Sequence, residues 1–374
     1  LTPHIETTPE NCMRHHLFVI GLILGLTSIA LGQVPPPTGK KIVPAGAKLE
    51  LLYTRSANIE GGLTEGAAVA PDGSIYFTDI PLGENKQGMV QKGLIVRFDP
   101  ATMECSIFTD DSYQANGLMF DAQGRLVACE GSDHGGQCVS RWDVKTGKRE
   151  VVADKYMGKR FNAPNDLAID PAGRIYFTDP RYLGDEPREL EHRAVYRVET
   201  DGEVVEVTHD LEKPNGIAIS PDQKTLYVAD HNNGTDRIDP DSKSPPQKGA
   251  MKIYAFPLGA DGLVAGARTT LYDFGTENGC DGMCLDVEGN LYLTARSTNR
   301  PGVLVLSPEG DEIAFIPTGP SQPGAKEPKG LPSNCDFGIG DESNMFYVTI
   351  DLSLYRIRLS MDGWHIPWAK GVGR

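Results

Sequence analysis

One hairpin pattern recurs six times along the chain and limits the possible folds more than any other feature. A turn built from Asp, Gly, Pro, Glu, Ser, Gln or small residues separates an apolar segment from a strand rich in β-branched and aromatic residues. Such units are typical of β-hairpins. A pattern that returns at a fixed period indicates a repeat architecture. The strands that follow the six turns are residues 75–79, 126–129, 175–179, 226–230, 291–294 and 345–349.

The spacing of the copies is about 50 residues, which is enough for one four-stranded blade per copy. Six blades could stack in a line or close into a ring, and closure hides the strand edges without special caps. We therefore predict an all-β fold, a six-bladed β-propeller. Residues 48–53 have strand character but precede the first repeat, and the chain ends soon after Ile357. This N-terminal strand is expected to complete the final blade and close the ring.

Composition agrees with many short strands joined by tight turns. The chain has 42 Gly and 27 Pro, with 23% charged residues and a formal net charge of −15. A nucleic-acid partner is disfavoured because phosphate binding needs clustered Lys and Arg, and no such run occurs. Two intervals rich in Gly, Pro and polar residues, 231–248 and 317–332, are predicted to be surface loops.

The N-terminal segment has the pattern of a secretory signal. Met13 is followed by Arg14 and two histidines, then by an apolar run over residues 17–31, with Ala30 and Gly32 at the positions that a signal peptidase requires. We expect cleavage after Gly32, export to the periplasm or the extracellular medium, and no membrane attachment afterwards. The predicted divisions are an over-translated stretch (1–12), the signal peptide (13–32), a linker (33–44) and the propeller (45–374).

Cysteine usage does not define a dense disulfide framework, although export would permit disulfides. Cys280 and Cys284 lie four residues apart on a predicted strand. At the usual rise they are separated by about 13 Å and cannot bridge each other. A bridge between Cys129 and Cys138 stays open, and most of the cysteines are expected to be buried.

A polar residue starts the inner strand of each of the first five repeats, eight positions before the end of the turn. Equivalent positions in a propeller are related by rotation, so these side chains should converge near the mouth of the central channel. Any one Asn or Asp before Gly could be a simple turn former, but the aligned set favours a site. The five residues are Glu65, Asn116, Asn165, Asn215 and Asp281; in the last repeat the register slips and leaves Asn334, Cys335 or Asp336.

Two carboxylates with several amide oxygens form a hard donor set. Such a set suits one divalent ion, with Ca²⁺ the first candidate, Mg²⁺ or Mn²⁺ close behind and Zn²⁺ possible in principle. The candidate ligands are the aligned residues Glu65, Asn116, Asn165, Asn215 and Asp281. The residues predicted to contact substrate are Asn116, Asn165 and His134.

The chain resembles the gluconolactonase branch of the SMP-30/regucalcin lactonase family, over essentially all of residues 45–360. The motifs that carry the resemblance are Glu65-Gly66, Asn162-Ala163-Pro164-Asn165-Asp166, Tyr176-Phe177-Thr178-Asp179-Pro180, Pro214-Asn215-Gly216 and Cys280-Asp281-Gly282-Met283.

The resemblance implies roles for several of these positions. It implies that the positions of Glu65, Asn215 and Asp281 bind metal, that Asn165 lies beside metal and substrate, and that Asp281 transfers the proton. With this resemblance we predict that the metal ligands are Glu65, Asn165, Asn215 and Asp281. Ala163 stands where the family's animal members have Arg, so contacts to a sugar lactone are expected to differ. The pair Ala67-Ala68 departs from the Pro and aromatic residue that are common there.

The chemistry expected of such a site is hydrolysis of a small lactone. A divalent ion polarises the carbonyl and stabilises the oxyanion while a carboxylate, here Asp281, takes a proton from water. A covalent serine mechanism is disfavoured because the chain has no Gly-x-Ser-x-Gly motif. His134, in Ser132-Asp133-His134-Gly135-Gly136, is a candidate proton shuttle as in other propeller lactonases, although a solvent-facing loop position is the more common reading; His231 is a similar case.

Two other functions stay open at this stage. The first is a non-catalytic propeller that presents its loops to a protein or a glycan while the metal holds the channel together, because propellers host both kinds of function. The second is hydrolysis of a phosphotriester by the same metal arrangement. The partner predicted first is a small-molecule lactone, and the oligomeric state is open.

Overall fold

The protein is described by a computed structural model that covers residues 34–55, 60–81, 83–236, 247–319 and 330–372. The chain divides into a short unit, Leu1–Gln33, and a large compact unit, Val34–Arg374. The predicted over-translated stretch (1–12) and signal peptide (13–32) lie outside the described residues. The same holds for residues 237–246 and 320–329 within the two predicted surface loops.

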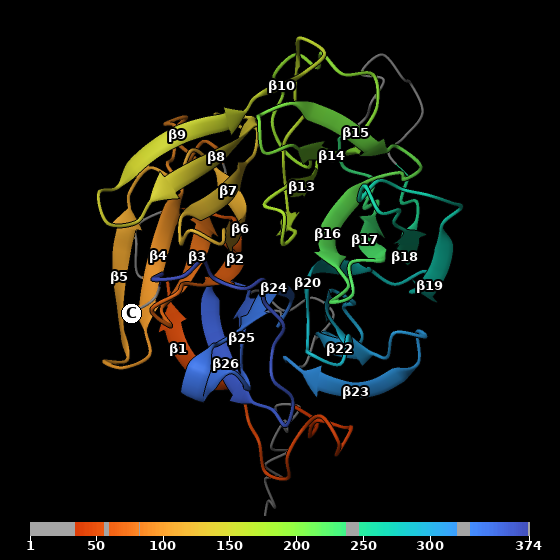
Figure 1. Cartoon of the computed structure of the whole chain (residues 1–374). Helices are drawn as coiled ribbons and strands as arrows, with labels where there is room; N and C mark the ends of the chain where they lie inside the picture. The colour runs from red at the N-terminus through yellow and green to blue at the C-terminus, as the bar shows by residue number, and fades with distance from the viewer. Residues whose placement is uncertain (1–33, 56–59, 82, 237–246, 320–329, 373–374) are drawn as a thin grey trace, which may run out of the picture. The chain divides into compact units, whose positions relative to one another are not determined.

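The large unit is a six-bladed β-propeller of four-stranded antiparallel sheets, as predicted (Figure 1). Blade 1 contains β2 (Leu63–Val69), β3 (Ile75–Ile80), β4 (Leu94–Asp99) and β5 (Glu104–Thr109); blade 2 contains β6 (Ala115–Phe120), β7 (Leu126–Glu130), β8 (Cys138–Asp143) and β9 (Lys148–Ala153); blade 3 contains β12 (Leu167–Ile169), β13 (Ile175–Thr178), β14 (Val195–Val198) and β15 (Val204–Thr208). Blade 4 contains β16 (Pro214–Ile219), β17 (Thr225–His231), β18 (Met251–Pro257) and β19 (Thr269–Asp273); blade 5 contains β20 (Cys280–Leu285), β21 (Leu291–Ala295), β22 (Gly302–Leu306) and β23 (Glu312–Pro317).

Blade 6 joins the two ends of the ring. It contains β24 (Pro332–Phe337), β25 (Met345–Ile350), β26 (Ser353–Arg358) and the N-terminal strand β1 (Glu50–Thr54), which pairs antiparallel with β26. Glu50 lies opposite Arg356 and accepts a hydrogen bond from its Nε at 2.8 Å. The prediction that an N-terminal strand completes the last blade is confirmed.

The first strand of each blade lies next to the central axis, and each of these inner strands contacts the inner strands of both neighbouring blades (Figure 1). Apolar side chains fill the space between blades. Between blades 5 and 6, for example, the rings of Tyr292, Phe337 and Phe346 lie 5.0–5.3 Å apart and are fully buried. These aromatic residues belong to the repeated strands, as the sequence pattern indicates.

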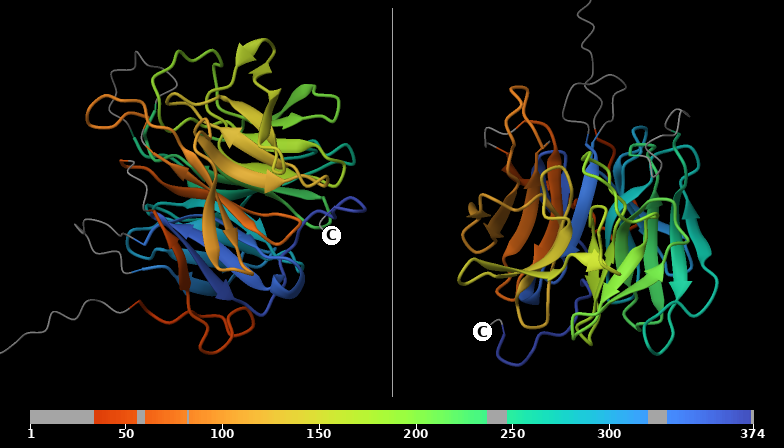
Figure 2. Two further views of the ribbon diagram at one scale, coloured as in Figure 1. Left: turned by 90° about the vertical axis from the view of Figure 1, so that its left-hand side faces the viewer. Right: turned by 90° about the horizontal axis from the view of Figure 1, so that it is seen from above.

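The C-terminal segment after β26 crosses one end of the channel. The N–H of Trp364 donates to the carbonyl of Leu285 in blade 5, and the N–H of Ala369 donates to the carbonyl of Ala122 beside blade 2. Blades 2 and 5 lie opposite each other in a six-membered ring, so the segment spans its diameter. Figure 2 places this segment at a single face of the ring.

A cavity of about 80 Å³, called the second cavity below, lies beneath this C-terminal segment. Its walls are formed by the inner strands and by Trp364, His365, Ile366 and Trp368. His365 binds the carboxylate of Asp336 through Nε2 at 3.0 Å. The segment thus covers the end of the channel with apolar and paired polar side chains.

Smaller elements complete the fold. A hairpin of β10 (Lys155–Tyr156) and β11 (Lys159–Arg160) projects from the blade 2 to blade 3 connection, and η1 (Gly340–Glu342) is a single 3-10 turn. Part of the predicted linker over 33–44 packs on the propeller, since Ile42 and Val43 are buried among residues of blades 5 and 6. None of the helices in the described part of the chain is long and apolar enough to span a membrane.

Candidate active site

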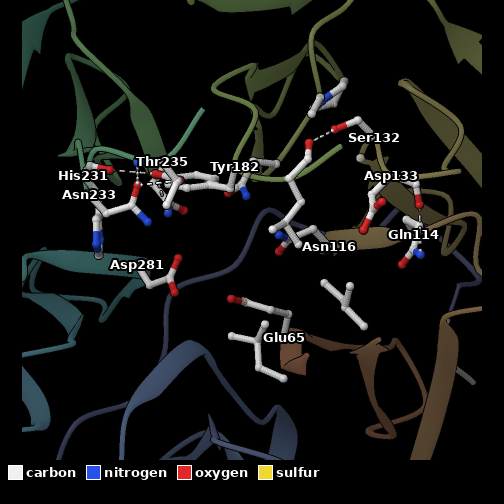
Figure 3. Close-up of a pocket in the computed structure, with 18 of the residues that line it drawn as sticks. Glu65, Gln114, Asn116, Ser132, Asp133, Tyr182, His231, Asn233, Thr235 and Asp281 are labelled. Carbon is white, nitrogen blue, oxygen red and sulfur yellow. Dashed lines mark hydrogen bonds between the residues drawn. The ribbon is translucent and has the colours of Figure 1, made fainter. Parts of the chain in front are cut away.

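A cavity of about 270 Å³ opens at the end of the channel opposite the C-terminal segment (Figure 3). All five polar residues that the repeat alignment selected line this cavity: Glu65, Asn116, Asn165, Asn215 and Asp281. His231, the last residue of β17, and the connections between strands supply the rest of its polar lining; the connections contribute Gln114, Ser132, Asp133, Tyr182, Asn233, Thr235 and Arg296. Apolar side chains cover part of the wall, namely Leu63, Ile80, Pro81, Ala163, Pro164 and Leu183.

A recurrent bulge in the inner strands lies where polar side chains of several blades face the cavity. In five of the six inner strands the pairing with the second strand shifts register at this point, as between Ala115 and Leu118 in β6 and between Cys280 and Met283 in β20. A bulge leaves a residue out of the regular ladder and redirects its side chain. Asn116 and Asp281 are the first residues of their bulges, and Glu65 is the last paired residue before the bulge of β2, opposite Thr78.

The last blade departs from this pattern. The equivalent position in β24 is Ser333, which is buried and hydrogen-bonded to the carbonyl of Thr64 and the hydroxyl of Thr349. Asn334 and Asp336, two of the residues predicted for this place, line the second cavity instead. Blade 6 therefore supplies no oxygen ligand of the kind expected, because a serine fills its bulge and bonds to its neighbours.

The glycines that follow the polar residues are explained by the close approach of neighbouring blades. A Cβ on Gly66 would lie 2.1 Å from the carbonyl oxygen of Asn116, and a Cβ on Gly216 would lie 2.2 Å from that of Asp281. Both distances are far below van der Waals contact, so a side chain would force the inner strands apart. The Glu-Gly, Asn-Gly and Asp-Gly pairs thus belong to inner strands and are not turn formers.

Two carboxylates face each other across the cavity. In Figure 3 the carboxyl groups of Glu65 and Asp281 point toward one another, and only 3% and 9% of these residues are exposed. Burial, together with the nearby Asp281, raises the pKa of Glu65 well above its ordinary value. Arg296 binds the Oδ2 atom of Asp281 through Nη1 at 3.1 Å and balances part of the charge.

The amide of Asn215 is held in one orientation. Its Nδ2 donates to the hydroxyl of Tyr182 at 3.0 Å, and that hydroxyl donates in turn to the carbonyl of His231 at 3.0 Å. With the amide nitrogen engaged in this way, the atom that Asn215 offers to the cavity is its oxygen. Tyr182 thus fixes which end of the amide a ligand meets.

A buried lysine supports the same wall of the cavity. The ammonium group of Lys213 binds the side chain of Asn233 and both oxygens of Thr235, and it lies 4.2 Å from the centre of the Tyr182 ring. Burial lowers the pKa of Lys213 to about 7. The loop over residues 231–236 and the Tyr182 ring are therefore held together by one cation.

His231 is the histidine that reaches the cavity. Its Nδ1 lies 2.8 Å from the carbonyl oxygen of Cys280, and because a carbonyl can only accept, Nδ1 carries the proton and Nε2 keeps a lone pair. Burial lowers the pKa of His231, although the nearby Asp281 opposes this shift. A neutral imidazole with one free lone pair can accept a proton.

His134 is not among the residues that line the cavity. Its half-exposed side chain places Nε2 3.5 Å from Glu84, and its backbone N–H donates to Glu186. Asp133 and His134 both adopt positive φ angles, and it is Asp133 that lines the cavity while its Oδ2 accepts from the N–H of Gly83 at 2.7 Å. The predicted substrate contact of His134 thus gains no support, because the turn directs its neighbour inward.

The cysteines among the described residues, from Cys105 to Cys335, are free thiols. Cys138 donates to the carboxylate of Glu130 at 3.2 Å, and Cys129 lies against the carbonyl of Asp166, so these two are not bridged. Burial raises the pKa of both thiols. They pack as core residues.

The donor set of the cavity fits a hard divalent cation. Two buried carboxylates face one guanidinium, which leaves negative charge uncompensated, and the raised pKa of Glu65 reflects it. A bound cation would compensate this negative charge and so remove the free-energy cost of burying it. The residues placed to hold it are Glu65, Asn165, Asn215 and Asp281, whose ligand roles remain a prediction.

The fold and the cavity define a class: a six-bladed propeller with a carboxylate- and amide-lined pocket on its axis. Within this class the chain belongs to the SMP-30/gluconolactonase/LRE-like family, whose profile matches residues 121–350. The family expected from the sequence motifs is thereby confirmed.

Individual relatives agree with this assignment. A gluconolactonase of Zymomonas mobilis is 31% identical over 261 residues, which are 67% of this chain and 64% of that protein. A lactonohydrolase of Aspergillus oryzae is 29% identical over 263 residues, 65% of this chain and 58% of that protein. The chain thus spans about three-fifths of the length of these two relatives.

A solved structure gives the same result for the fold. The gluconolactonase of Xanthomonas campestris superposes with a TM-score of 0.67 and 27% identity, over 87% of this chain and 95% of that one. The likeness therefore covers most of both chains.

Proposed function

We propose that this protein hydrolyses small lactones of the sugar-lactone type in a metal-dependent reaction at the cavity of Figure 3. The observation that carries the proposal is the meeting of Glu65, Asn165, Asn215 and Asp281 in one cavity, in a chain whose relatives are named gluconolactonase and lactonohydrolase. A bound divalent ion would polarise the lactone carbonyl and stabilise the negative charge that develops on its oxygen.

The chain's own residues would perform the proton transfer. Asp281 has one oxygen bound by Arg296, so its other oxygen is the atom that can face water in the cavity. We assign it the role of general base, which takes a proton from water as the water oxygen bonds to the carbonyl carbon. When the ring carbon–oxygen bond then breaks, Asp281 returns that proton to the leaving ring oxygen, which gives the hydroxy acid. His231, with its free Nε2, is the second group able to take that proton.

Other residues would bind and orient the substrate. Asn116 and Asn165 present amides to the cavity, and Leu63, Ile80 and Leu183 form an apolar wall on which a ring can rest. Ala163 lines the cavity where the family's animal members have Arg. The substrate is therefore expected to make fewer charged contacts than in those members.

A substrate panel tests the proposal. The purified protein, loaded with Ca²⁺ and then treated with EGTA, is assayed against gluconolactone, aliphatic γ- and δ-lactones and a phosphotriester. Lactone turnover that stops with the chelator and returns with metal supports the proposal. Metal binding without turnover of any compound would favour the non-catalytic propeller, and turnover of the phosphotriester alone would favour that hydrolase.

We also propose that the protein is exported. The support is the basic start and apolar run of residues 13–32. N-terminal sequencing of the protein recovered from cells that express the whole chain should begin at Gln33. Recovery of intact Met13 from the cytoplasmic fraction alone would contradict export.

A further inference from the structure

A group of two histidines and a carboxylate lies on blade 3, away from the channel. His192, Glu206 and His209 each offer one ligand atom, and these atoms all lie within 4.8 Å of one another. Nε2 of His192 is 2.9 Å from Oε2 of Glu206, and Nδ1 of His209 is 2.5 Å from Oε1. None of the three lines the cavity of the proposed lactonase site.

The backbone of β15 brings Glu206 and His209 to the same side. Residues three apart on a regular strand point to opposite faces. Here the pairing of β14 with β15 shifts register, since Val195 lies opposite Thr208 and Tyr196 lies opposite Glu206. Val207 is the extra residue of this bulge, and it shifts by one position the alternation of side chains between the two faces of the sheet. The bulge therefore aligns the two side chains.

His192 reaches the group from the connection that precedes β14. It precedes β14 by three residues, and its carbonyl accepts a hydrogen bond from Nδ2 of Asn162 at 3.1 Å. Its ring lies 4.7 Å from the ring of His209, measured between centroids. Two separate segments thus present imidazoles to the shared carboxylate.

We propose that His192, Glu206 and His209 form a second metal site, which takes a borderline transition-metal ion such as Zn²⁺. Imidazole nitrogens suit Zn²⁺, Cu²⁺ and Ni²⁺ and do not suit Ca²⁺ or Mg²⁺. Three protein ligands and a water complete the usual tetrahedral arrangement, with bonds of about 2.0–2.2 Å. The ion takes the place of the two shared protons, so the nitrogen and oxygen atoms need to separate only slightly.

The side chains can make this adjustment because the group is accessible. The side chains of His192 and His209 are 43% and 63% exposed, and that of Glu206 is 19% exposed. An ion can therefore enter from solvent, and the better buried carboxylate anchors it. Once bound, it ties the turn before β14 to the end of β15.

Calorimetric titration with zinc tests the proposal on the whole protein without a polyhistidine tag and with Ca²⁺ in excess. We expect H192A and H209A each to weaken zinc binding by more than the roughly 10–100-fold typical of losing a hydrogen-bonding partner of a ligand. The matched control is H134A, because His134 is also half exposed but lies beside a single carboxylate, that of Glu84. This variant should bind zinc as the wild type does. Equal zinc affinity of wild type and the H192A/H209A double variant would overturn the site.

A second measurement needs no variant. Zinc should protect His192 and His209 of the wild-type protein from acylation by diethyl pyrocarbonate, while His134 reacts as before; mass spectrometry locates the modified residues. Identical modification of all three with and without zinc would also overturn the site. Neither readout depends on lactone hydrolysis, so failure of one proposal leaves the other unaffected.

Discussion

The two ends of the channel are built from the same six inner strands but differ in chemistry. At the open end, bulged positions present carboxylates and amides to a cavity of about 270 Å³. At the other end, the same strands present mostly apolar side chains to a cavity of about 80 Å³, which the C-terminal segment covers. The open end gathers carboxylates and amides around a cavity, whereas the covered end is mostly apolar, with Asp166, Asn334 and Asp336 among its polar side chains.

The open end of the channel is therefore expected to serve function, and the covered end to serve the stability of the fold. Buried carboxylates without full compensation destabilise the folded state, and their retention at the open end points to a use outside folding. The covered end contributes the apolar burial that stabilises the fold. Substitutions at the two ends should therefore have opposite signatures, which can be measured as follows.

The largest effect is expected for Asp281→Asn at the open end. Asn preserves the size and one ligand oxygen but cannot accept a proton, so turnover of a lactone should fall by roughly 10²–10⁴, the usual contribution of general-base catalysis. The melting temperature of the metal-free protein should not fall, because the variant removes one of two facing carboxylates. The measurement is the initial hydrolysis rate in a pH-stat at saturating Ca²⁺.

A second variant, Asn215→Ala, distinguishes the loss of a general base from the loss of a metal ligand. Asn215→Ala weakens coordination, so added Ca²⁺ should restore much of its activity, whereas metal cannot replace a missing base. Wild-type turnover by Asp281→Asn would remove Asp281 as the base, and the same assay on His231→Gln would then test the other candidate.

The reverse signature is expected at the covered end for Ile366→Ala. Ile366 is 2% exposed and packs among residues of blades 2 and 3, so its truncation should cost about 2–5 kcal/mol of unfolding free energy. The kcat of the folded protein should be unchanged. Urea denaturation gives the stability, and exposed Lys370→Ala is the control. Loss of activity without loss of stability would show that the two ends are not independent.

A smaller effect concerns the pH dependence of stability in the metal-free protein. Because the pKa of Glu65 is raised above its ordinary value of 4.5, the folded state binds the proton more tightly than the unfolded chain. The contribution of Glu65 to the free energy of unfolding should therefore be fully present below pH 4.5. It should be lost as the pH rises through the raised pKa of Glu65 in the folded state. Ca²⁺ at a hundred times its Kd should add about 2.7 kcal/mol.

Glu65→Gln isolates this contribution. Asp179 and Asp230 also have pKa values raised by burial, to about 6 each, and they act equally in both proteins. Asp166, whose pKa burial raises to about 7, interacts with Glu65, so its contribution changes with the variant and adds to the difference between the two curves. Urea unfolding in EGTA between pH 5 and 8 should show a shallower decline for the variant, together with a smaller shift on adding Ca²⁺. Parallel curves for the two proteins would contradict the assignment.

The smallest effect is expected for Tyr182→Phe. The variant removes the hydroxyl that orients the amide of Asn215, and a hydrogen bond of this kind contributes about 0.5–1.5 kcal/mol. Ca²⁺ affinity should fall by roughly 2–10-fold while the fold is preserved. Calorimetric titration with Ca²⁺ measures this change, and unchanged affinity would mean that Tyr182 does not position Asn215.

The repeated parts of this structure could be predicted from the sequence, and the unrepeated parts could not. Six similar hairpins were enough for six blades, for closure by residues 48–53 and for the convergence of five polar residues, because rotation maps one copy onto the next. The sequence alignment did not select Ser333 as the blade 6 residue at this position, because Ser333 carries neither a charge nor an amide. The alignment therefore offered Asn334, Cys335 or Asp336 in its place.

The connections between strands hold the residues that sequence reasoning missed. Tyr182 and Arg296 follow the second strands of their blades, and their loops differ in length and sequence, so no repeat pointed to them. His231 and His134 were given similar weight, and the structure separates them. The C-terminal segment has apolar residues but no periodicity, and its contact with Ala122 depends on the closed ring.

The pairing of β1 with β26 has a consequence for when the chain can fold. Glu50 and Arg356 are 306 residues apart, so closure brings together the most distant parts of the propeller, and contacts of such long sequence separation make folding slow. A ribosome must release almost the whole chain before the ring can shut. If the chain is exported, it can thus cross the membrane before its last blade forms, and the N-terminal strand remains unpaired until the final strand emerges.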